Sequence, residues 1–222
     1  MSRAIAVLRP EPGNRVTAAA IEAQGRHAIR LPLFEARPLA WDVPDPSRFD
    51  ALLLTSANAV RHAGPGLSKL RSLPVHAVGD VTAEAARRAG FAVAATGDAG
   101  AEALVAQATA LGVRHALHLA GRERTLEAGG IIAQVLTVYA SEALPVTPHE
   151  AAKLAGAVAL VQSTRAGARL AEIVEPAMRG DIALIAPSAR AAAAAGDGWE
   201  RIIVPRDFRG TALIDAAIAL AD

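Results

Sequence analysis

LLLTSANAV, residues 52–60, is a short apolar run that passes directly into small hydroxyl and amide side chains. An apolar run of this length is typical of a buried strand in a parallel sheet. Thr55, Ser56 and Asn58 suit the start of a helix, because their side chains can accept hydrogen bonds from the unpaired N–H groups of its first turn. Those N–H groups and the helix dipole also favour an anion there. The stretch therefore predicts a strand, a polar turn and a helix whose N-terminus suits an anionic ligand.

The same pattern returns at residues 160–165, which read LVQSTR. Ser163 lies 107 positions after Ser56, and the same offset carries AVGD at 77–80 onto LIAP at 184–187. One constant offset across two strand-to-loop motifs indicates an internal duplication, with each copy a small α/β lobe.

Composition limits the class of protein. The chain has 222 residues, enough for one large domain or two small ones. Hydrophobic residues make up 52% and aromatic residues only 3%, so the core must consist mostly of Ala, Val, Leu and Ile, which suits helices packed on parallel strands. A net charge of +1 gives no general attraction to nucleic acid or membranes. The absence of Cys excludes disulfides, thiolate metal sites and thiol catalysis.

The basic residues are strongly biased, because 21 of the 23 are Arg and only Lys69 and Lys153 are Lys. Genomic base composition explains such a bias, and bidentate recognition of carboxylates is the functional alternative. The strand-like residues 4–8 are stopped by RPEPG at 9–13, which is not the pattern of a signal peptide. No apolar run approaches the length of a membrane span. We therefore expect a soluble cytoplasmic protein.

Hydrophobic periodicity and Gly/Pro positions predict alternating strands and helices. Residues 40–140 hold a complete α/β unit, and residues 1–35 and 144–222 together make a matching set. We expect a discontinuous lobe one (1–35 plus 144–222), an inserted lobe two (40–140), and linker strands near 34–39 and 138–144 that pair as an antiparallel ladder. The expected strands are 4–8, 27–33, 52–54, 75–78, 116–120, 135–140, 158–161, 182–185 and 201–204; the expected helices are 15–24, 58–62, 82–89, 101–111, 165–174, 189–195 and 211–220, with a loop at 96–100.

A cleft between the two lobes follows from this arrangement. In open α/β sheets, ligands bind beyond the carboxyl ends of the strands. The polar residues expected at those ends are Thr55-Ser56, Gly79-Asp80, Gly121-Arg122, Ser163-Thr164 and Pro187-Ser188.

Short motifs follow one another along nearly the whole chain. They are RP at 9–10, TSANAV at 55–60, AVG-x-x-TA at 77–83 followed by Gly90, VY at 138–139, the second Ser motif at Ser163 and TALIDAAI at 211–218. In their order and spacing they resemble the uroporphyrinogen-III synthase family. Two departures stand out: Leu8 replaces a commoner Thr before Arg9, and Ala186 and Ala189 stand where the second Gly-x-x-Thr motif would have Gly and Thr, leaving Ser188 as a weak substitute.

The resemblance implies an α/β fold of two flavodoxin-like lobes with parallel sheets, joined by a two-stranded antiparallel linker. It implies cyclisation of hydroxymethylbilane, a linear tetrapyrrole octacarboxylate, to uroporphyrinogen III, with inversion of the last pyrrole ring and loss of water. It also implies that no metal and no organic cofactor is needed. The expected partner is this small molecule, not nucleic acid or a membrane, and the expected state is a monomer.

For such a reaction the main task is to hold the substrate folded, which is positioning catalysis. Tyr139, the only Tyr, could donate a proton to the leaving hydroxyl; a half-buried strand tyrosine is the alternative. The residues expected to contact the substrate are Arg9, Thr55, Ser56, Asn58, Gly79, Thr82, Gly121, Arg122, Ser163, Thr164 and Ser188. Plain N-capping is the alternative for the hydroxyl and amide residues, and a solvated surface position is the alternative for the arginines. His62, His76 and His118 suit the core or its rim, and no His/Asp/Glu cluster has metal-ligand spacing.

A second class of function fits the same features. A two-lobed binding or sensory protein could close on an anionic small molecule without chemistry, using the cleft but not Tyr139. Formation of isomer III from hydroxymethylbilane distinguishes the two, because spontaneous closure gives isomer I. A regulator with a receiver-like lobe is disfavoured, since no acidic pocket pairs a strand-end Asp with a downstream Lys.

Overall fold

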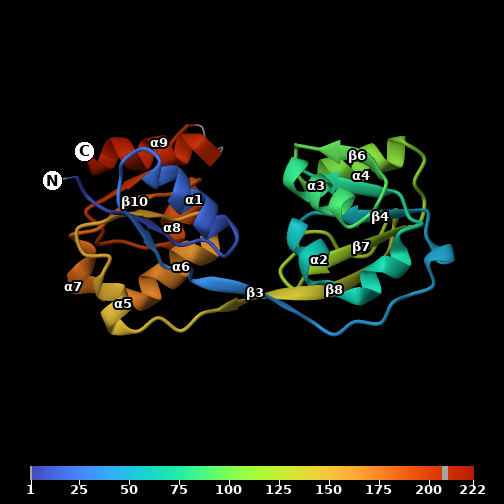
Figure 1. Cartoon of the computed structure of the whole chain (residues 1–222), viewed down its shortest axis with the longest axis horizontal. Coiled ribbons are helices and arrows are strands. Elements are labelled where there is room, and N and C mark those ends of the chain that lie inside the picture. Colours follow the sequence, from blue (N-terminus) through green and yellow to red (C-terminus); the bar gives the residue numbers. More distant parts are fainter. Residues whose placement is uncertain (1, 207–209) are drawn as a thin grey trace. The chain divides into compact units, whose positions relative to one another are not determined.

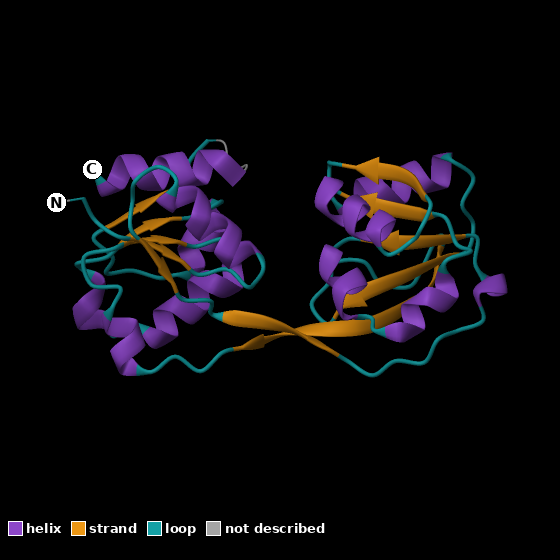
Figure 2. Ribbon diagram, in the orientation of Figure 1, coloured by secondary structure: helices purple, strands orange, loops and turns teal. Residues whose placement is uncertain are grey.

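The computed structural model describes residues 2–206 and 210–222. The chain divides into two compact units. The terminal unit comprises Met1–Glu35 and Ala143–Asp222, and the inserted unit comprises Ala36–Glu142. Figure 1 shows the terminal unit in blue and orange-red and the inserted unit in the intervening colours, and Figure 2 shows that strands and helices alternate in both.

The terminal unit holds a parallel sheet with the strand order β11-β10-β9-β1-β2. Its elements are β1 (Ile5–Val7), α1 (Gly13–Glu22), β2 (Ala28–Arg30), α5 (Pro148–Ala152), β9 (Val158–Leu160), α6 (Thr164–Ile173), α7 (Pro176–Arg179), β10 (Ala183–Ile185), α8 (Ala189–Ala194), β11 (Arg201–Ile203) and α9 (Gly210–Ala221).

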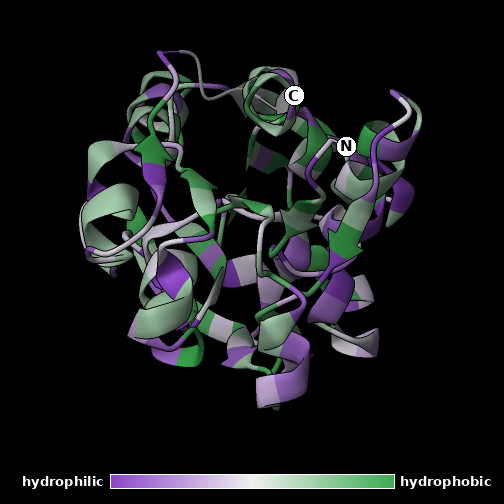
Figure 3. Ribbon diagram, turned by 90° about the vertical axis from the view of Figure 1, so that its left-hand side faces the viewer, coloured by the Kyte–Doolittle hydropathy of each residue, from purple (hydrophilic) through white to green (hydrophobic). Residues whose placement is uncertain are grey.

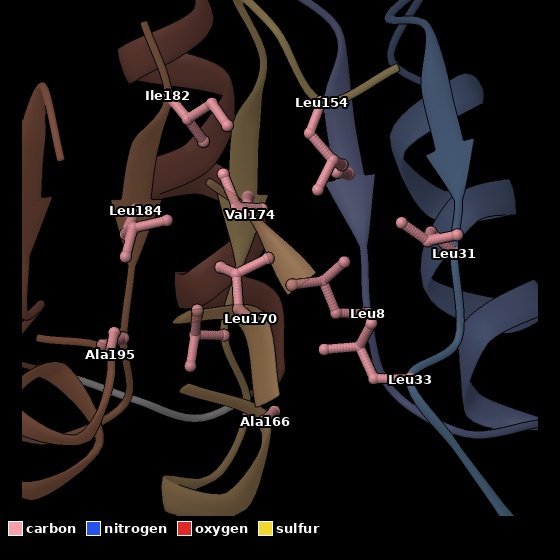
Figure 4. Close-up of a cluster of buried hydrophobic side chains, with 14 of the residues drawn as sticks. Leu8, Leu31, Leu33, Leu154, Ala166, Leu170, Val174, Ile182, Leu184 and Ala195 are labelled. Carbon is pink, nitrogen blue, oxygen red and sulfur yellow. The ribbon is translucent and has the colours of Figure 1, made fainter. Parts of the chain in front are cut away.

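Alternation along these short strands sends side chains to two separate cores, one on each face of the sheet. Ile5 and Val7 pack with α1 and α9, whereas Ala6 and Leu8 belong to the core that α6 and α8 cover. Figure 4 shows Leu8, Leu170 and Leu184 among the side chains that meet in this second core. In Figure 3 the strands are mostly green, and purple residues lie mainly on the outer helices and loops. Each such buried leucine contributes roughly 2 kcal/mol of transfer free energy.

The inserted unit holds a sheet with the strand order β3-β8-β7-β4-β5-β6. Leu52 and Leu54 of β4 face the core that α2 and α3 cover, and Leu53 faces the smaller core beside α4. The elements are β3 (Phe34–Pro38), β4 (Ala51–Leu54), α2 (Ala57–His62), β5 (Val75–Val78), α3 (Asp80–Arg88), β6 (Val93–Gly97), α4 (Ala101–Ala110), β7 (Ala116–Gly121) and β8 (Ile132–Ala143), with short 3-10 helices at η1 (Pro46–Arg48) and η2 (Pro65–Leu70).

The chain passes between the units on β3 and β8, which are neighbours in the sheet. The Leu39 N–H donates to the Val138 carbonyl, and the Leu144 N–H donates to the Leu33 carbonyl, both at 2.9 Å. Residue numbers rise on one side as they fall on the other, so these two segments run antiparallel.

The two units share one arrangement of parallel strands. β6-β5-β4-β7-β8 in the inserted unit corresponds to β11-β10-β9-β1-β2 in the terminal unit. The strands come in a different chain order in the two units. Numbered along the chain within its own unit, the inserted sheet has the order 3-2-1-4-5. The terminal sheet has the order 5-4-3-1-2, which read from its other edge is 2-1-3-4-5, the order of flavodoxin. The chain order reverses between β4 and β7 in one unit and between the equivalent strands β9 and β1 in the other.

The structure corrects the sequence reading in three places. The loop expected at 96–100 is wrong at its start, because β6 runs from Val93 to Gly97 and pairs with β5. Most residues of β6 are only partly buried, as at the edge of a sheet, so its sequence contains no apolar run that would predict a strand. The helices α5 and α7 were not expected from the sequence. α5 begins at a capping box between Thr147 and Glu150.

Candidate active site

The reversal of chain order in the inserted unit brings two predicted loops together. β4 leads into Thr55 and Ser56, and its neighbour β7 ends at Gly121 and leads into Arg122. Open α/β sheets bind ligands at the carboxyl ends of strands where the order reverses. The predicted residues that follow β4 and β7 therefore share the edge of this sheet where a ligand is expected.

Ser56 is the N-cap of α2. Its backbone is extended, at φ −151° and ψ 137°, and its Oγ accepts from the Asn58 N–H at 3.2 Å. Asn58 lies inside the helix, so the capping role considered for it is wrong; its Oδ1 accepts from Arg61 at 3.2 Å. The TSAN turn thus places a half-buried hydroxyl at the end of β4.

Gly79 is the N-cap of α3, after β5. Its φ of 74° lies in the left-handed region that favours glycine. Its N–H donates to the Gly97 carbonyl at 2.7 Å, so this residue contributes a backbone conformation and not a free amide. Thr82 is buried in the first turn of α3, and the capping role considered for it is therefore wrong.

Tyr139 lies half-buried on β8, paired in register with Gly121. Its ring covers the Gly121 backbone, where an added Cβ would lie 2.7 Å from Cζ. The ring of His62 is tilted by 33° to the ring of Tyr139, with the two centroids 6.1 Å apart. Within residues 2–206 and 210–222, no hydrogen bond occupies the phenolic oxygen. The phenol is held by its neighbours while its hydroxyl group keeps its donor and acceptor capacity.

The arginines after β7 have acidic partners. Arg122 pairs with Glu142 at 2.8 Å, and Arg124 pairs with Glu127 at 3.0 Å. Arg124 also donates to the Thr137 hydroxyl at 3.0 Å. Arg122 and Glu142 are largely exposed, so their pair contributes about 1 kcal/mol or less. A carboxylate of a ligand can therefore replace Glu142 at little energetic cost.

His118 was expected in the core or at its rim, and it is fully buried on β7. Burial lowers its pKa to about 4, and the charge of Arg124 acts in the same direction. Its Nε2 lies 3.3 Å from Oγ1 of Thr55. His76 is also buried, and burial lowers the pKa of His62 and of His76.

In the terminal unit the reversal of chain order brings β1 and β9 together. Ser163, after β9, caps α6 by accepting from the Ala166 N–H at 3.1 Å, and Thr164 is the first residue of that helix. Ser188, after β10, caps α8 by accepting from the Ala191 N–H at 3.2 Å. Ser188, expected from the sequence to be only a weak substitute in the second Gly-x-x-Thr motif, therefore caps its helix in the same way as Ser163.

Arg9 follows β1 in a loop that a buried side chain organises. The Arg9 guanidinium folds over Gly13, where an added Cβ would lie 2.5 Å from Nε, and this partial burial lowers the pKa of Arg9. Asn14 is fully buried and donates to the carbonyls of Val7 at 2.7 Å and Arg9 at 3.1 Å. Its Oδ1 accepts from Arg30 at 3.1 Å. Sequence reasoning missed Asn14, because its partners are not visible in any local pattern.

Two surface hollows occur among the described residues, and the first includes Asp80, which follows Gly79. One of about 520 Å³ lies between α2 and α3, lined by Val60, Arg61, Asp80, Val81, Glu84, Ala85 and Arg88. Another of about 350 Å³ lies beside α5 and α6 and includes Arg169 and Glu172. Across the described ranges, no three His, Asp or Glu side chains gather closely enough to hold a metal ion. None of the helices in the described part of the chain has both the length and the apolar character that a membrane span requires.

Comparisons with known proteins match the chain as a whole. A family model described as uroporphyrinogen-III synthase HemD matches residues 15–215. The fold is similar to the crystal structure of uroporphyrinogen-III synthetase from Helicobacter pylori 26695, with 19% identity, 98% of this chain and 99% of that chain covered, and a TM-score of 0.69. It is also similar to a mutant uroporphyrinogen III synthase from the extremely thermophilic bacterium Thermus thermophilus, with 17% identity, 99% of both chains covered, and a TM-score of 0.53. No curated protein sequence matches it. Because the family model spans all but the ends of the sequence, the chain belongs to the uroporphyrinogen-III synthase family.

Proposed function

We propose that the chain converts hydroxymethylbilane to uroporphyrinogen III through the strand-end residues described above, with inversion of the last ring and loss of water. The family match over residues 15–215 carries the assignment of the reaction. As a member of this family the chain is a cyclising lyase of tetrapyrrole and heme biosynthesis. The assignment of individual residues is supported by their position and chemistry.

The reaction begins with loss of the terminal hydroxyl group. The C–O bond breaks, the hydroxide takes a proton and leaves as water, and the remaining azafulvene is electrophilic. The substituted carbon of the last pyrrole ring then attacks it, and a C–C bond forms. The older bond from that carbon to its methylene bridge breaks, which leaves a new azafulvene on the third ring. The unsubstituted carbon of the last ring attacks this azafulvene and loses its proton, so the ring is inverted and the net loss is one water. These steps need a proton donor near the leaving hydroxyl and a fixed substrate conformation, so proximity supplies much of the rate enhancement. They involve no redox change, and we expect activity to persist in the presence of a metal chelator.

Tyr139 is proposed as the donor to the leaving hydroxyl. Support comes from the phenolic oxygen, which is free to hydrogen-bond, and from the contacts of its ring with Gly121 and His62. A ring packed against its neighbours presents its hydroxyl in one place, which general acid catalysis requires.

The carboxylates of the substrate are proposed to bind at the strand ends of both units. Arg9 and Arg122 supply charge, and the hydroxyl groups and helix starts after β4 and β9 supply hydrogen-bond donors. The proposed contacts are Arg9, Thr55, Ser56, Asn58, Gly79, Thr82, Gly121, Arg122, Ser163, Thr164 and Ser188. We propose further that the units act as the two lobes of one enzyme, joined by β3 and β8, with the substrate between them, and that the enzyme works as a cytoplasmic monomer.

The test supplies the purified chain with freshly prepared hydroxymethylbilane, oxidises the products to porphyrins and separates the isomers by chromatography. We expect isomer III to dominate, while the same mixture without protein gives isomer I. Isomer I alone, at the rate without protein, would overturn the proposal and favour a binding protein. A chelator added in parallel tests the independence from metal.

A further inference from the structure

A buried histidine lies directly against a hydroxyl of the proposed site. His118 on β7 is 0% exposed, and its Nε2 is 3.3 Å from Oγ1 of Thr55, which follows β4. Thr55 itself is only half-buried, so part of this residue remains accessible to a ligand. None of the reaction steps proposed above uses His118.

The strand register explains how the two side chains meet. His118 is paired with Leu53, and side chains two apart on a strand share a face of the sheet. Thr55 lies two residues beyond Leu53, so the His118 ring and the Thr55 hydroxyl lie on the same face of neighbouring strands. Ala116 and Val135, from the neighbouring core beside α4, lie on the same face, and the charges of Arg124 and Glu127 also act on the ring.

The other nitrogen of the ring decides where the proton lies. The His118 Nδ1 is buried and has no hydrogen-bond partner within the described residues. A proton on Nδ1 would bury an unpaired N–H group, which proteins strongly avoid, whereas a proton on Nε2 leaves only an unpaired acceptor. Since burial also lowers the pKa of His118 to about 4, the ring is neutral at pH 7. A neutral ring with its proton on Nε2 donates to the Thr55 oxygen.

We propose that His118 is a positioning residue that orients the Thr55 hydroxyl as a hydrogen-bond donor toward a carboxylate of the substrate. With its oxygen accepting from the ring, the Thr55 hydroxyl turns its own hydrogen outward. An ionised carboxylate, which can only accept, fits that donor. This inference rests on the proposed binding role of Thr55.

The kinetic test compares Thr55→Val, His118→Leu, His118→Gln and the double variant Thr55→Val/His118→Leu. We expect Thr55→Val to raise KM about tenfold with little change in kcat, because it removes one charge-assisted hydrogen bond. His118→Leu should raise KM in the same direction, and the double variant should match Thr55→Val alone because His118 acts through Thr55. His118→Gln should recover most of the loss, since its amide N–H can replace the Nε2–H.

His76→Leu is the matched control. His76 pairs with Leu53 from the opposite neighbouring strand and is buried with an unpartnered Nδ1, and within the part of the chain that is described it makes no hydrogen bond to a residue of the proposed site. A KM unchanged in His76→Leu and raised in His118→Leu supports the positioning role. Three results would overturn it: a KM in the double variant that combines the separate effects of the two substitutions, a KM in His118→Gln as high as in His118→Leu, or a KM in His118→Leu equal to that of the wild type.

A readout independent of activity is the ring tautomer. In ¹⁵N NMR spectra of the labelled full chain at pH 7, we expect His118 to be protonated on Nε2, with the assignment made by comparison with His118→Gln. Protonation on Nδ1 would overturn the inference even if the protein forms isomer III. If the wild-type protein forms no isomer III, the proposed function itself fails, so the two failures are distinguishable.

Discussion

The ring of Tyr139 lies against the Cα of Gly121 so closely that a Cβ on that glycine would be 2.7 Å from Cζ and 2.9 Å from the phenolic oxygen. The two residues are paired on β7 and β8, and the Arg122 N–H donates to the Tyr139 carbonyl at 2.9 Å. A methyl group at residue 121 would therefore force either the Tyr139 ring or the adjoining backbone to move. The position of the phenol therefore depends on the absence of a side chain at residue 121.

Gly121→Ala is expected to lower kcat about 100-fold, the effect of a displacement of roughly 1 Å at a reacting group. Gly121 is not among the glycines with a left-handed backbone, so alanine tests the displacement of the ring and not backbone strain. Gly97→Ala is the matched control, since a Cβ there meets its nearest neighbour, on Leu104, at 3.4 Å. The measurement is steady-state kinetics on both variants, with unfolding in urea to check that each is folded. Equal kcat values in Gly121→Ala and Gly97→Ala would contradict the prediction.

Tyr139→Phe is expected to lower kcat about 10- to 100-fold, the range of a lost general acid, with little change in KM. The ring stays in place against Gly121 and His62, so the free energy of unfolding should change little. As enzymatic closure slows, spontaneous closure competes and the share of isomer I should rise. Initial rates and the isomer ratio measure this, and a kcat equal to that of the wild type would remove Tyr139 from the chemistry.

Ser56→Ala and Ser163→Ala should each lower the free energy of unfolding by about 1 kcal/mol through loss of an N-cap, and each should also raise KM. Thr147→Ala is the control, because Thr147 also caps a helix through its hydroxyl, as part of the capping box of α5, and is not among the proposed contacts. We expect a similar loss of stability there with KM unchanged. Urea denaturation and substrate titration of the three variants separate capping from binding; if KM stays constant in all three, the serines are caps alone.

Stability is expected to fall as the pH drops from about 6.5 to about 4. Burial lowers the pKa of His118 from 6.5 to about 4, so over this range the unfolded chain binds a proton that the folded chain does not. The loss is absent above pH 6.5, is complete near pH 4 and amounts to about 3 kcal/mol for this residue. His62 and His76 have pKa values lowered by burial and act in the same direction.

The measurement is urea unfolding at pH 7.5, 5.5 and 4.5 for the wild type and for His118→Leu. The variant lacks the titrating ring, so its free energy of unfolding should fall by about 2.5 kcal/mol less between pH 7.5 and pH 4.5. Parallel pH profiles for the two proteins would show that His118 does not titrate as its burial requires.

Sequence reasoning succeeded where local chemistry determines local structure. The run Val75–Val78 is a strand in the structure with the expected bounds, because an apolar run between Pro74 and Gly79 has few other solutions. Ser163 was found as a helix start because a hydroxyl follows a buried strand within three residues. β6 was missed because its small residues, at an edge of the sheet, carry neither a long apolar run nor strict alternation.

The parts of the site that could not be predicted depend on contacts that only the fold creates. His118 gains its significance from Thr55, 63 residues away, and Asn14 gains its significance from carbonyls that only the fold brings to it. In the sequence, a His between two leucines indicates burial and nothing more. The register of β4 against β7 supplies the missing information.

The matching strand orders of the two sheets have a consequence for how the chain is connected. β1 and β2 take the places in the terminal unit that β7 and β8 take in the inserted one, and the Arg3 N–H near the start of the chain donates to the Ala221 carbonyl near its end at 2.9 Å. If residues near the two ends of the chain were joined and the chain were opened between β2 and β4, the strands of the two units would follow one another as a tandem repeat. The strand orders of the two units are therefore related by a cyclic permutation of two strands.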